Sequence, residues 1–543
     1  MKIKLGILSF FAIMLSLSAQ ERNKYWIHFA DKNEQVALLE RPNSFLSDKA
    51  IERRKLQGIE INETDLPVSR IYLNQLVEAG IEPLYSSRWF NMTSAKLSKE
   101  ELRNLNQLPF IEKISLHKGL LKDGQSLDVE TSYEMVIDST EEDYYGLASR
   151  QINMLNGVGL HDLDYKGQGM TIAVLDAGFL NANILPVFDN AWAANRIIVG
   201  PDFVRGNDTL VDFSHSTHGT NVLGFMASEL PDVYVGTAPL ANYILIRTEN
   251  GPSEAVVEEY YWLQGAEYAD SMGADLINSS LGYTTFDDST ESHSYDDLDG
   301  NTTLITKAAD MAAAKGILVV NSAGNSGANS WYYISAPADA DSVMTVGSVN
   351  GFEESSLFSS HGPTADDRIK PNVVAHGELV YTVWVDSAFY PSNGTSFSAP
   401  VLTGMTACLW QYKRALEDST ISNMEIIELV ESSSSQYPFS DPNLGYGIPN
   451  FGLATAPLST VEIEQMDVSI YPNPFNTEIH ISSNHEKLFG YSLVDVYGRV
   501  LIQEISEIGV QEYSIQIPLN VSMGNYFIIV ESTEGRIVNK LVK

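Results

Sequence analysis

Short apolar runs alternate with helical stripes between residues 148 and 455. The runs Thr171 to Leu175, Tyr243 to Ile246 and Ile317 to Val320 have no polar face, so they predict strands that are buried on both sides. Apolar residues spaced as on one helix face precede Gly316, which predicts a helix that ends at this glycine. Strands that alternate with helices predict an α/β fold, with a parallel sheet flanked by helices.

The flanking regions have other patterns. Residues 20–117 contain short amphipathic pieces: Tyr25 to Phe29 alternates like a strand, and Ser47 to Leu56 predicts a charged surface helix. This pattern indicates a small α+β domain. Residues 118–147 are acidic and show little periodicity, which is typical of an exposed linker that proteases can cut.

The two ends of the chain are also distinct. Residues 465–543, after a linker at 456–464, alternate apolar and polar positions and predict a C-terminal β-sandwich. Residues 1–19 have a basic start, an apolar stretch and small residues at the end, as a signal peptide does. A membrane anchor is the alternative, but this stretch is shorter than the ~20 residues that a spanning helix needs. No later segment is long and apolar enough, so we expect an exported mature protein without a transmembrane span.

Composition narrows the choice of function. The formal net charge of −36 argues against binding to nucleic acid. Cys408 is the single cysteine, so neither an intrachain disulfide nor a thiolate metal cluster can form. Its apolar neighbours indicate a buried, inert thiol.

Four polar residues stand where strands end or helices begin. Asp176 directly follows the run Thr171 to Leu175, and His218 opens an apolar helical segment. Ser396 lies where a turn enters a long apolar helix, and Asn325 follows the run Ile317 to Val320. Each has an ordinary structural alternative, such as a helix cap or a turn residue. Together they offer a nucleophile, a base, a group that orients the base, and an oxyanion donor.

Two neighbouring residues compete with these candidates. His215 lies three residues before His218 and is a possible decoy, and the two histidines could also form a metal pair, although no third ligand is close in sequence. Ser398 is a second capping candidate beside Ser396. We therefore expect a catalytic site without a metal.

The order Asp, His, Ser, with an Asn between His and Ser, is that of subtilisin-type triads rather than of chymotrypsin or the α/β-hydrolases. Residues 148–455 resemble the subtilase family of serine peptidases. The motifs that carry the resemblance are Val174-Leu175-Asp176-Ala177-Gly178, His218-Gly219-Thr220, Ala323-Gly324-Asn325 and Gly394-Thr395-Ser396-Phe397-Ser398-Ala399-Pro400.

This resemblance implies a role for each residue. Ser396 would be the nucleophile, His218 its general base, Asp176 the group that orients His218, and Asn325 part of the oxyanion hole. The stretch Ser280-Leu281-Gly282 resembles the family's substrate-pairing strand. Ala177 is a departure, because the family commonly has Ser or Thr there.

The flanks resemble known companions of subtilases. Residues 20–117 are similar to an inhibitory propeptide, and the tail, with Tyr471-Pro472-Asn473-Pro474, is similar to a sorting domain of type IX secretion. The resemblance implies a secreted or cell-surface endopeptidase, made as a zymogen, that acts on proteins or peptides, is inhibited by its own propeptide and passes through the type IX machinery. An ordinary β-sandwich module is the alternative for the tail.

The chemistry implied in this way needs no cofactor. Acidic loops at Asp287-Asp288 and Asp296-Asp297 carry oxygen ligands that suit structural calcium, and simple solvation of these loops is the alternative. Two other functions remain to be compared. A binding protein on an inactive subtilase scaffold would normally lack a catalytic residue, and an esterase of the α/β-hydrolase type would need its serine before its Asp and His.

Overall fold

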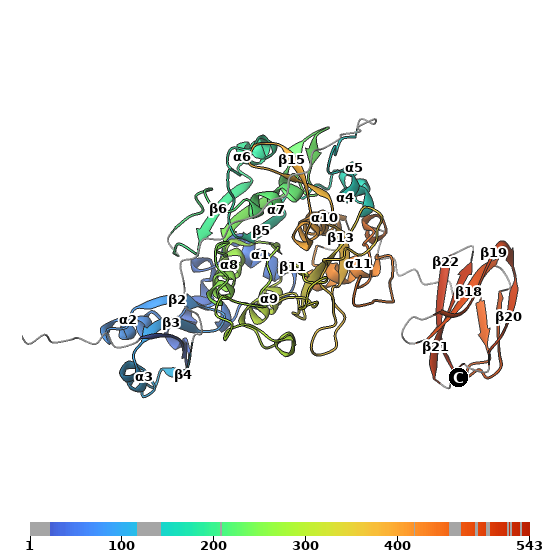
Figure 1. The fold of residues 1–543 in the computed structure, drawn as a ribbon. Helices are drawn as coiled ribbons and strands as arrows, with labels where there is room; N and C mark the ends of the chain where they lie inside the picture. Colours follow the sequence, from blue (N-terminus) through green and yellow to red (C-terminus); the bar gives the residue numbers. More distant parts are fainter. Residues whose placement is uncertain are drawn as a thin grey trace, which may run out of the picture.

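The computed structural model describes residues 22–116, 143–206, 209–416, 419–455 and 468–543, the last range with short gaps at 484–486, 496–499, 519–520, 522–523 and 533–534. The expected signal peptide, the linker at 456–464 and residues 118–142 of the expected acidic linker lie outside the described residues. Three folded parts follow one another along the chain (Figure 1).

The central part is built on a seven-stranded parallel sheet with the order β13-β12-β11-β10-β5-β9-β6. The strand-rich apolar runs of the sequence therefore form the predicted parallel sheet. Its strands are β5 (Thr171–Asp176), β6 (Ile197–Asp202), β9 (Asn242–Arg247), β10 (Leu276–Ser279), β11 (Leu318–Ser322), β12 (Val343–Val349) and β13 (Val373–His376).

Helices cover both faces of this sheet (Figure 1). Alternate residues of β5 point to opposite faces, so Ile172 and Val174 join one hydrophobic cluster and Ala173 and Leu175 join the other. The helices are α4 (Ser149–Met154), α5 (Val158–Asp162), α6 (Asp189–Ala193), α7 (His218–Ala227), α8 (Val257–Met272), α9 (Leu304–Ala314), α10 (Thr395–Leu416), α11 (Asn423–Ser432) and α12 (Phe451–Ala454).

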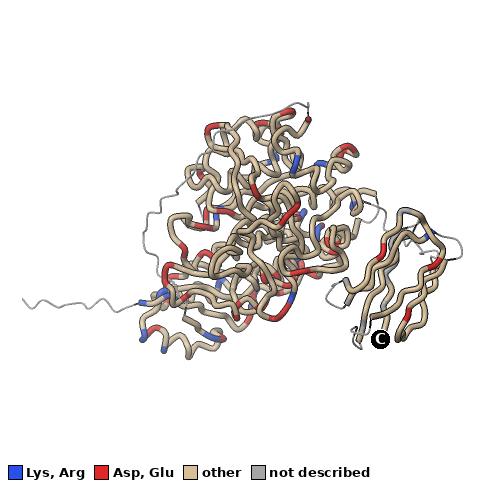
Figure 2. Tube along the Cα trace, turned by 45° about the vertical axis from the view of Figure 1, so that its right-hand side comes forward, with Lys and Arg blue, Asp and Glu red and all other residues tan. Residues whose placement is uncertain are grey.

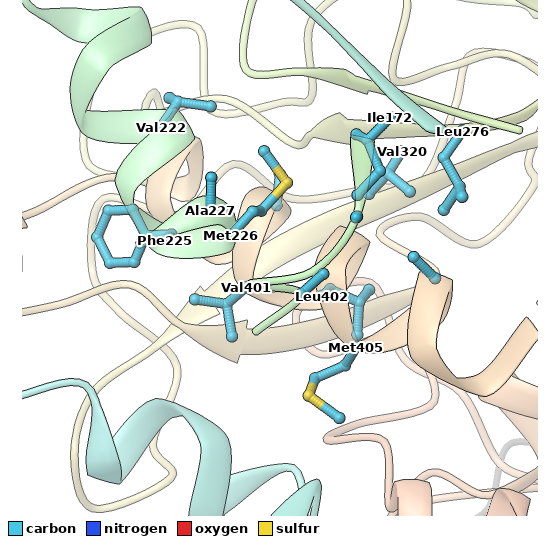
Figure 3. Close-up of a cluster of buried hydrophobic side chains, with 14 of the residues drawn as sticks. Ile172, Val222, Phe225, Met226, Ala227, Leu276, Val320, Val401, Leu402 and Met405 are labelled. Atoms are coloured by element: carbon cyan, nitrogen blue, oxygen red, sulfur yellow. The ribbon is translucent and has the colours of Figure 1, made fainter. Parts of the chain in front are cut away.

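Helices α7 and α10 pack against one another on the first face. Their apolar side chains meet those of the sheet in one buried cluster, which fixes where each helix begins. Figure 3 shows Val222, Phe225, Met226 and Ala227 of α7, Val401, Leu402 and Met405 of α10, and Ile172, Leu276 and Val320 of the sheet.

The N-terminal part is an antiparallel sheet with the order β2-β3-β1-β4 and three helices, as predicted for a small α+β domain. Its core contains residues such as Ile27, Leu76 and Leu97. Its elements are β1 (Asn23–Phe29), α1 (Asp48–Leu56), α2 (Arg70–Glu78), β2 (Pro83–Ser87), β3 (Met92–Leu97), α3 (Lys99–Leu105) and β4 (Ile111–Leu116).

The C-terminal part has two antiparallel sheets, β16-β17-β20 and β19-β18-β21-β22, around a core of its own. Residues of both sheets, such as Ile479 and Ile528, are fully buried in this core. The strands are β16 (Val468–Tyr471), β17 (Glu478–Ser483), β18 (Leu488–Asp495), β19 (Val500–Val510), β20 (Glu512–Gln516), β21 (Asn525–Ser532) and β22 (Gly535–Val542).

Residues 143–147 differ from the expectation of a linker, because they are packed on the central part. The Leu147 amide donates to the Val233 carbonyl at 2.9 Å, and the Tyr144 carbonyl accepts from the Asp232 amide at 3.0 Å. Tyr145 is buried and its hydroxyl lies 3.1 Å from His161 Nδ1. These contacts are made mainly by the backbone, which leaves no periodic pattern in the sequence.

Candidate active site

The candidate residues gather at one point on the edge of the parallel sheet. From β5 the chain builds β9 and β6 on one side, and it then returns to build β10, β11, β12 and β13 on the other. The carboxyl ends of β5 and β10 therefore flank the point where the strand order reverses, which is where open α/β sheets bind ligands. Asp176 is the last residue of β5, and Ser280 directly follows β10.

His218 and Asp176 form a hydrogen-bonded pair. His218 is the first residue of α7, and its Nδ1 lies 2.9 Å and 3.0 Å from the two carboxylate oxygens of Asp176. The carboxylate is fully buried, whereas 33% of the His218 side chain is exposed. Gly219 allows this approach, because a Cβ at position 219 would lie 2.3 Å from the Gly178 carbonyl oxygen.

The charge of Asp176 controls the protonation of this imidazole. Burial lowers the pKa of His218, but the adjacent Asp176 carboxylate outweighs burial through its charge and hydrogen bond, and the pKa rises to about 9. Asp176 also accepts the Ala177 amide at 2.7 Å. The departure from the family at position 177 thus leaves that backbone hydrogen bond in place.

A second carboxylate near the pair was missed by the sequence analysis. Glu249 follows β9 by two residues, and its negative charge also raises the pKa of His218. Burial, and then the charge of Asp176, raises the pKa of Glu249 to about 7. The Tyr283 hydroxyl donates to Glu249 at 3.4 Å. Like Asp176, Glu249 stands close to the carboxyl end of a buried strand, and this was the signal that could have identified it.

Ser396 lies at the beginning of α10. It is the second residue of the helix, so its amide is in the first turn, where N–H groups have no acceptor within the helix. The neighbouring Phe397 ring lies 6.3 Å from the His218 ring, between centroids. Ser396 and His218 are both described residues, and no hydrogen bond joins them in this structure. The Ser396 hydroxyl instead donates to the Ser280 carbonyl at 3.2 Å, and catalytic hydrogen bonds often form only with substrate bound.

Asn325 is held against the start of α10. Its Oδ1 accepts from the Thr395 amide at 2.9 Å and from the Thr395 hydroxyl at 3.0 Å. The side-chain amide Nδ2 lies on the side of Gly394, 3.7 Å from where a Cβ at that glycine would stand. It has no partner among the described residues, and Asn325 is exposed. Its two N–H donors are therefore free to bind an oxygen beside Ser396.

The segment Ser280-Leu281-Gly282 continues from β10 with much of its backbone unpaired. The Ser280 hydroxyl donates to the Ser396 carbonyl at 2.9 Å, which places this segment against the serine. The Leu281 carbonyl accepts from Asn321 at 3.1 Å. Within the described chain, the Leu281 amide and both backbone groups of Gly282 have no hydrogen-bond partner, so a further strand can pair with them.

The competing residues do not join this group. Ser398 is fully buried and its hydroxyl has no partner in the described chain, so it faces away from solvent beneath the first turn of α10. The imidazole of His215 is half-exposed and lies 3.8 Å from Asp212. Cys408 is buried, and burial raises the pKa of its thiol well above the usual range, as expected for an inert cysteine.

The N-terminal domain is held on helix α8 of the central part by a buried cluster of charges. Asp270 of α8 accepts from Arg53, Arg54 and Arg88, all from the N-terminal domain. Arg53 also donates to the carbonyls of Ala274 and Lys315. The predicted charged surface helix at 47–56 is thus a helix, but its placement was wrong, since Arg53 and Arg54 are 2% and 0% exposed.

The arginine charges decide the ionisation of Asp270. Burial alone would raise its pKa, but Arg88, Arg53 and Arg54 outweigh burial and lower the pKa to about 2. Aromatic contacts extend the interface, with Trp26 and Tyr85 packed on Tyr260 at ring separations of 4.7 Å and 5.2 Å. Figure 2 shows Asp and Glu spread along the chain, and the formal net charge is −36. Arginines of the N-terminal domain are therefore complementary in charge to the acidic helix surface at Asp270.

Comparison with known proteins identifies the three parts. The subtilase family model matches residues 167–447, which is more than half of the chain. The chain belongs to the subtilase family. A peptidase S8 propeptide domain of Bacteroidota matches residues 24–131, and a secretion system C-terminal sorting domain matches residues 469–543. The propeptide match thus extends beyond the boundary at 117 that the sequence pattern indicated.

Relatives of this subtilase match its central part. It is 28% identical to subtilisin DY of Bacillus licheniformis over 48% of this chain and 83% of the relative. It is also 28% identical to subtilisin E of Bacillus subtilis (strain 168), over 52% of this chain and 65% of the relative. The solved structure of MycP1 from the ESX-1 type VII secretion system aligns with 60% of this chain and 89% of its own, at 21% identity and a TM-score of 0.45.

Membership in this family makes the chain a serine-type endopeptidase, and its propeptide makes it a zymogen. The sorting domain indicates export to the cell surface or the medium. In the described part of the chain, no helix has the length and apolarity needed to cross a bilayer. Across the same residues, no three His, Cys, Asp or Glu side chains are grouped to hold a metal ion.

The acidic loops named as possible calcium sites engage in local hydrogen bonds. Asp288 accepts from the amide and hydroxyl of Thr290, and Asp297 accepts from the amide and hydroxyl of Ser294. Asp287 accepts from the Glu254 amide at 3.3 Å. Structural calcium at these loops therefore stays a prediction.

Proposed function

We propose that this subtilase cleaves peptide bonds through an acyl-enzyme on Ser396. In the first step the Ser396 hydroxyl oxygen attacks the carbonyl carbon of the bond, and its proton passes to Nε2 of His218. His218 then gives this proton to the leaving amine, and water repeats the sequence to release the acid. Asp176 keeps Nδ1 of His218 protonated and faces the positive charge that forms. The observation that carries the proposal is the Asp176–His218 pair at 2.9 Å, with the His218 ring 6.3 Å from the ring of Phe397 at the start of α10.

The oxyanion of each tetrahedral intermediate would be bound by two donors. One is the unpartnered Nδ2 amide of Asn325, and the other is the Ser396 backbone amide in the first turn of α10. The hydrogen bonds that anchor the Asn325 oxygen to Thr395 support this role for Asn325. Every group in this sequence of steps is a side chain or an amide of the chain, so the reaction as proposed uses no cofactor.

The substrate would bind as an added strand. Among the described residues, the Leu281 amide and the backbone groups of Gly282 are unpaired, and they can form hydrogen bonds with the backbone of an extended peptide. Such main-chain pairing depends little on the side chains of the peptide. Ser280, the first residue of this segment, is hydrogen-bonded to Ser396. This connection would fix which residue of the peptide lies beside the nucleophile. We infer that the substrates are proteins or peptides with an accessible extended segment.

The propeptide would inhibit the enzyme as part of the same chain before the cut and as a separate, bound piece after it. The charge cluster around Asp270 and the aromatic contacts at Tyr260 would keep the cleaved propeptide bound. The tail would direct the protein to the type IX machinery, as the sorting-domain match suggests. Cleavage between residues 117 and 142 would separate the propeptide from the enzyme, which would then begin close to Asp143. The residues that follow Asp143 are packed on the enzyme.

Replacement of the nucleophile tests the proposal. Ser396→Ala should abolish proteolysis, with a loss of roughly 10⁶-fold in kcat, and should leave an unprocessed precursor on a gel. Ser398→Ala is the matched control, since its hydroxyl has no partner among the described residues, and it should retain activity. A phosphonylating serine reagent should label Ser396 by peptide mass analysis. Normal cleavage by Ser396→Ala, or labelling of Ser398, would reject the assignment.

A further inference from the structure

Aromatic rings connect the starts of α7 and α10 with a buried tyrosine, Tyr234. The ring of Phe397, directly after Ser396, lies 6.3 Å from the His218 ring and is stacked on Phe225 at 5.3 Å, between centroids. Phe225 follows His218 by seven residues, so both lie on one face of α7 and Phe397 contacts both. Tyr234 in turn meets Phe225 edge-on, at 6.4 Å. The separation of the proposed base and nucleophile therefore depends on how these rings pack.

Tyr234 also holds the hairpin that leads into α10. This hairpin consists of β14 (Val380–Val383) and β15 (Phe389–Ser392), and only two residues separate β15 from α10. The Tyr234 ring is stacked on Phe389 at 4.9 Å, and its hydroxyl donates to the Tyr381 carbonyl at 2.9 Å. One fully buried side chain thus contacts both α7 and the hairpin that leads to the nucleophile.

Tyr234 is itself held by residues that closely follow the proposed maturation cut. It lies in β8 (Tyr234–Val235), which pairs with the equally short strand β7 (Glu229–Leu230). A hairpin of this size is not stable alone. Residues 144–147, here called the strap, add a third chain to it, and Gly146 forms a β-bridge with Tyr234. Three backbone hydrogen bonds, at 2.9 to 3.3 Å, join the strap to this hairpin.

Two residues fix the strap in place. Tyr145 is buried in a small apolar cluster, and its hydroxyl lies 3.1 Å from His161 Nδ1. Gly146 has a φ of +54°, and a Cβ there would lie 2.2 Å from the Val233 carbonyl oxygen. A larger residue at position 146 would therefore displace the strap from the hairpin.

We propose that Tyr234 is a positioning residue for the proposed reaction, and that the strap holds it in position. The rings between Tyr234 and His218 fix the distance over which the proton of Ser396 must pass. Loss of the Tyr234 ring would leave space into which Phe225 and Phe397 can move. Activity then depends on the segment next to the maturation cut, and a cut beyond the strap would yield a slow enzyme. This inference rests on the proposed function of Ser396 and His218.

The first test removes the Tyr234 ring. Tyr234→Leu should lower the kcat of the processed enzyme by roughly 10- to 100-fold with little change in KM, because it displaces the reacting groups and not the bound peptide. The labelling of Ser396 by a phosphonylating reagent should slow by a similar factor. Tyr234→Phe keeps the ring and should retain most of the activity.

Tyr243→Leu is the matched control. Tyr243 is fully buried in the same hydrophobic cluster, and its hydroxyl also donates to a backbone carbonyl, that of Ala238, at 2.7 Å. It lies near the amino end of β9, about 13 Å along the strand from Arg247 at the edge that carries the site. Tyr243→Leu should lower the unfolding temperature but leave kcat and the labelling rate unchanged. Equal kcat values for the two leucine variants would overturn this inference.

Gly146→Ala tests the strap without a change in the core, so it also serves if Tyr234→Leu does not fold. It should lower kcat in the same way. Gly169→Ala is its control, because Gly169 also has a positive φ, +79°, but a Cβ there meets nothing within 4 Å among the described residues. Combined with Tyr234→Leu, Gly146→Ala should add less than its own loss, since both act through one contact.

A kcat of Gly146→Ala equal to that of Gly169→Ala, or fully multiplicative losses in the double variant, would overturn this inference. Both results leave the proposed function standing as long as Ser396→Ala is inactive. Normal cleavage by Ser396→Ala would overturn the proposed function, and this inference with it.

Discussion

Arg53 offers a direct test of how the propeptide is held, because the hydrogen bonds of its side chain all cross to the enzyme. It donates to Asp270 at 2.5 Å and to the carbonyls of Ala274 and Lys315. Arg53→Ala therefore weakens the interface and leaves the sequence of the mature enzyme unchanged. Loss of one partner of a buried, hydrogen-bonded charge pair costs about 2–5 kcal/mol. Asp270 keeps Arg54 and Arg88, so we expect the lower part of this range.

A cost of about 2–3 kcal/mol corresponds to a roughly 30- to 150-fold weaker hold on the cleaved propeptide. The assay starts from processed but still inhibited protein, dilutes it, and follows the appearance of activity on a peptide substrate, normalised by titration of active sites. Arg53→Ala should gain activity faster by about this factor. Lys55→Ala is the matched control, because Lys55 lies on the same helix with 76% of its side chain exposed.

The two variants should reach the same final kcat, since the mature enzymes are identical. Equal lag times for Arg53→Ala and Lys55→Ala would refute the reasoning. The lowered pKa of Asp270 adds a pH condition. Docking lowers the pKa of the Asp270 carboxyl, so its ionised form stabilises the complex at any pH above its ordinary pKa, near 3.8. This stabilisation is lost only as the pH falls toward 2. Acidification to pH 5 should therefore not release the propeptide through Asp270.

Asn325→Asp keeps an acceptor for Thr395 but removes the donor, so kcat should fall by roughly 10²–10³-fold, and an unchanged kcat would exclude Asn325 from the oxyanion hole. The proposed general base His218 must be neutral to accept a proton, so log kcat/KM should rise with pH up to the pKa of His218, about 9. Glu249→Gln should move this rise to lower pH, and a pH–rate profile that stays in place would contradict the charge effect of Glu249. The Asp176–His218 pair should stabilise the fold fully below about pH 6.5, and thermal unfolding should detect its loss as the pH rises through about 9.

The strands and the positions of the candidate residues could be predicted from sequence because their signals are local. An apolar run such as Thr171 to Leu175 is buried on both faces, and its next residue must emerge at the sheet edge, which located Asp176. The start of α10 could be located in the same way, from a turn that enters an apolar stripe. These features depend on neighbours in the chain.

The features that sequence analysis missed depend on distant residues or on the backbone. Arg53 and Arg54 were expected at the surface, because a basic helix normally needs solvent, and the carboxylate that neutralises them lies more than 200 residues later. Residues 143–147 dock through amides and carbonyls, which every residue type supplies.

The C-terminal sandwich buries its own apolar residues, and in the described chain none of them belongs to the two clusters that line the parallel sheet. A cut between residues 455 and 468 would therefore expose no interior of the peptidase. The exported enzyme can be shortened after delivery without refolding, and its resistance to heat should be the same with or without the final 76 residues, 468–543.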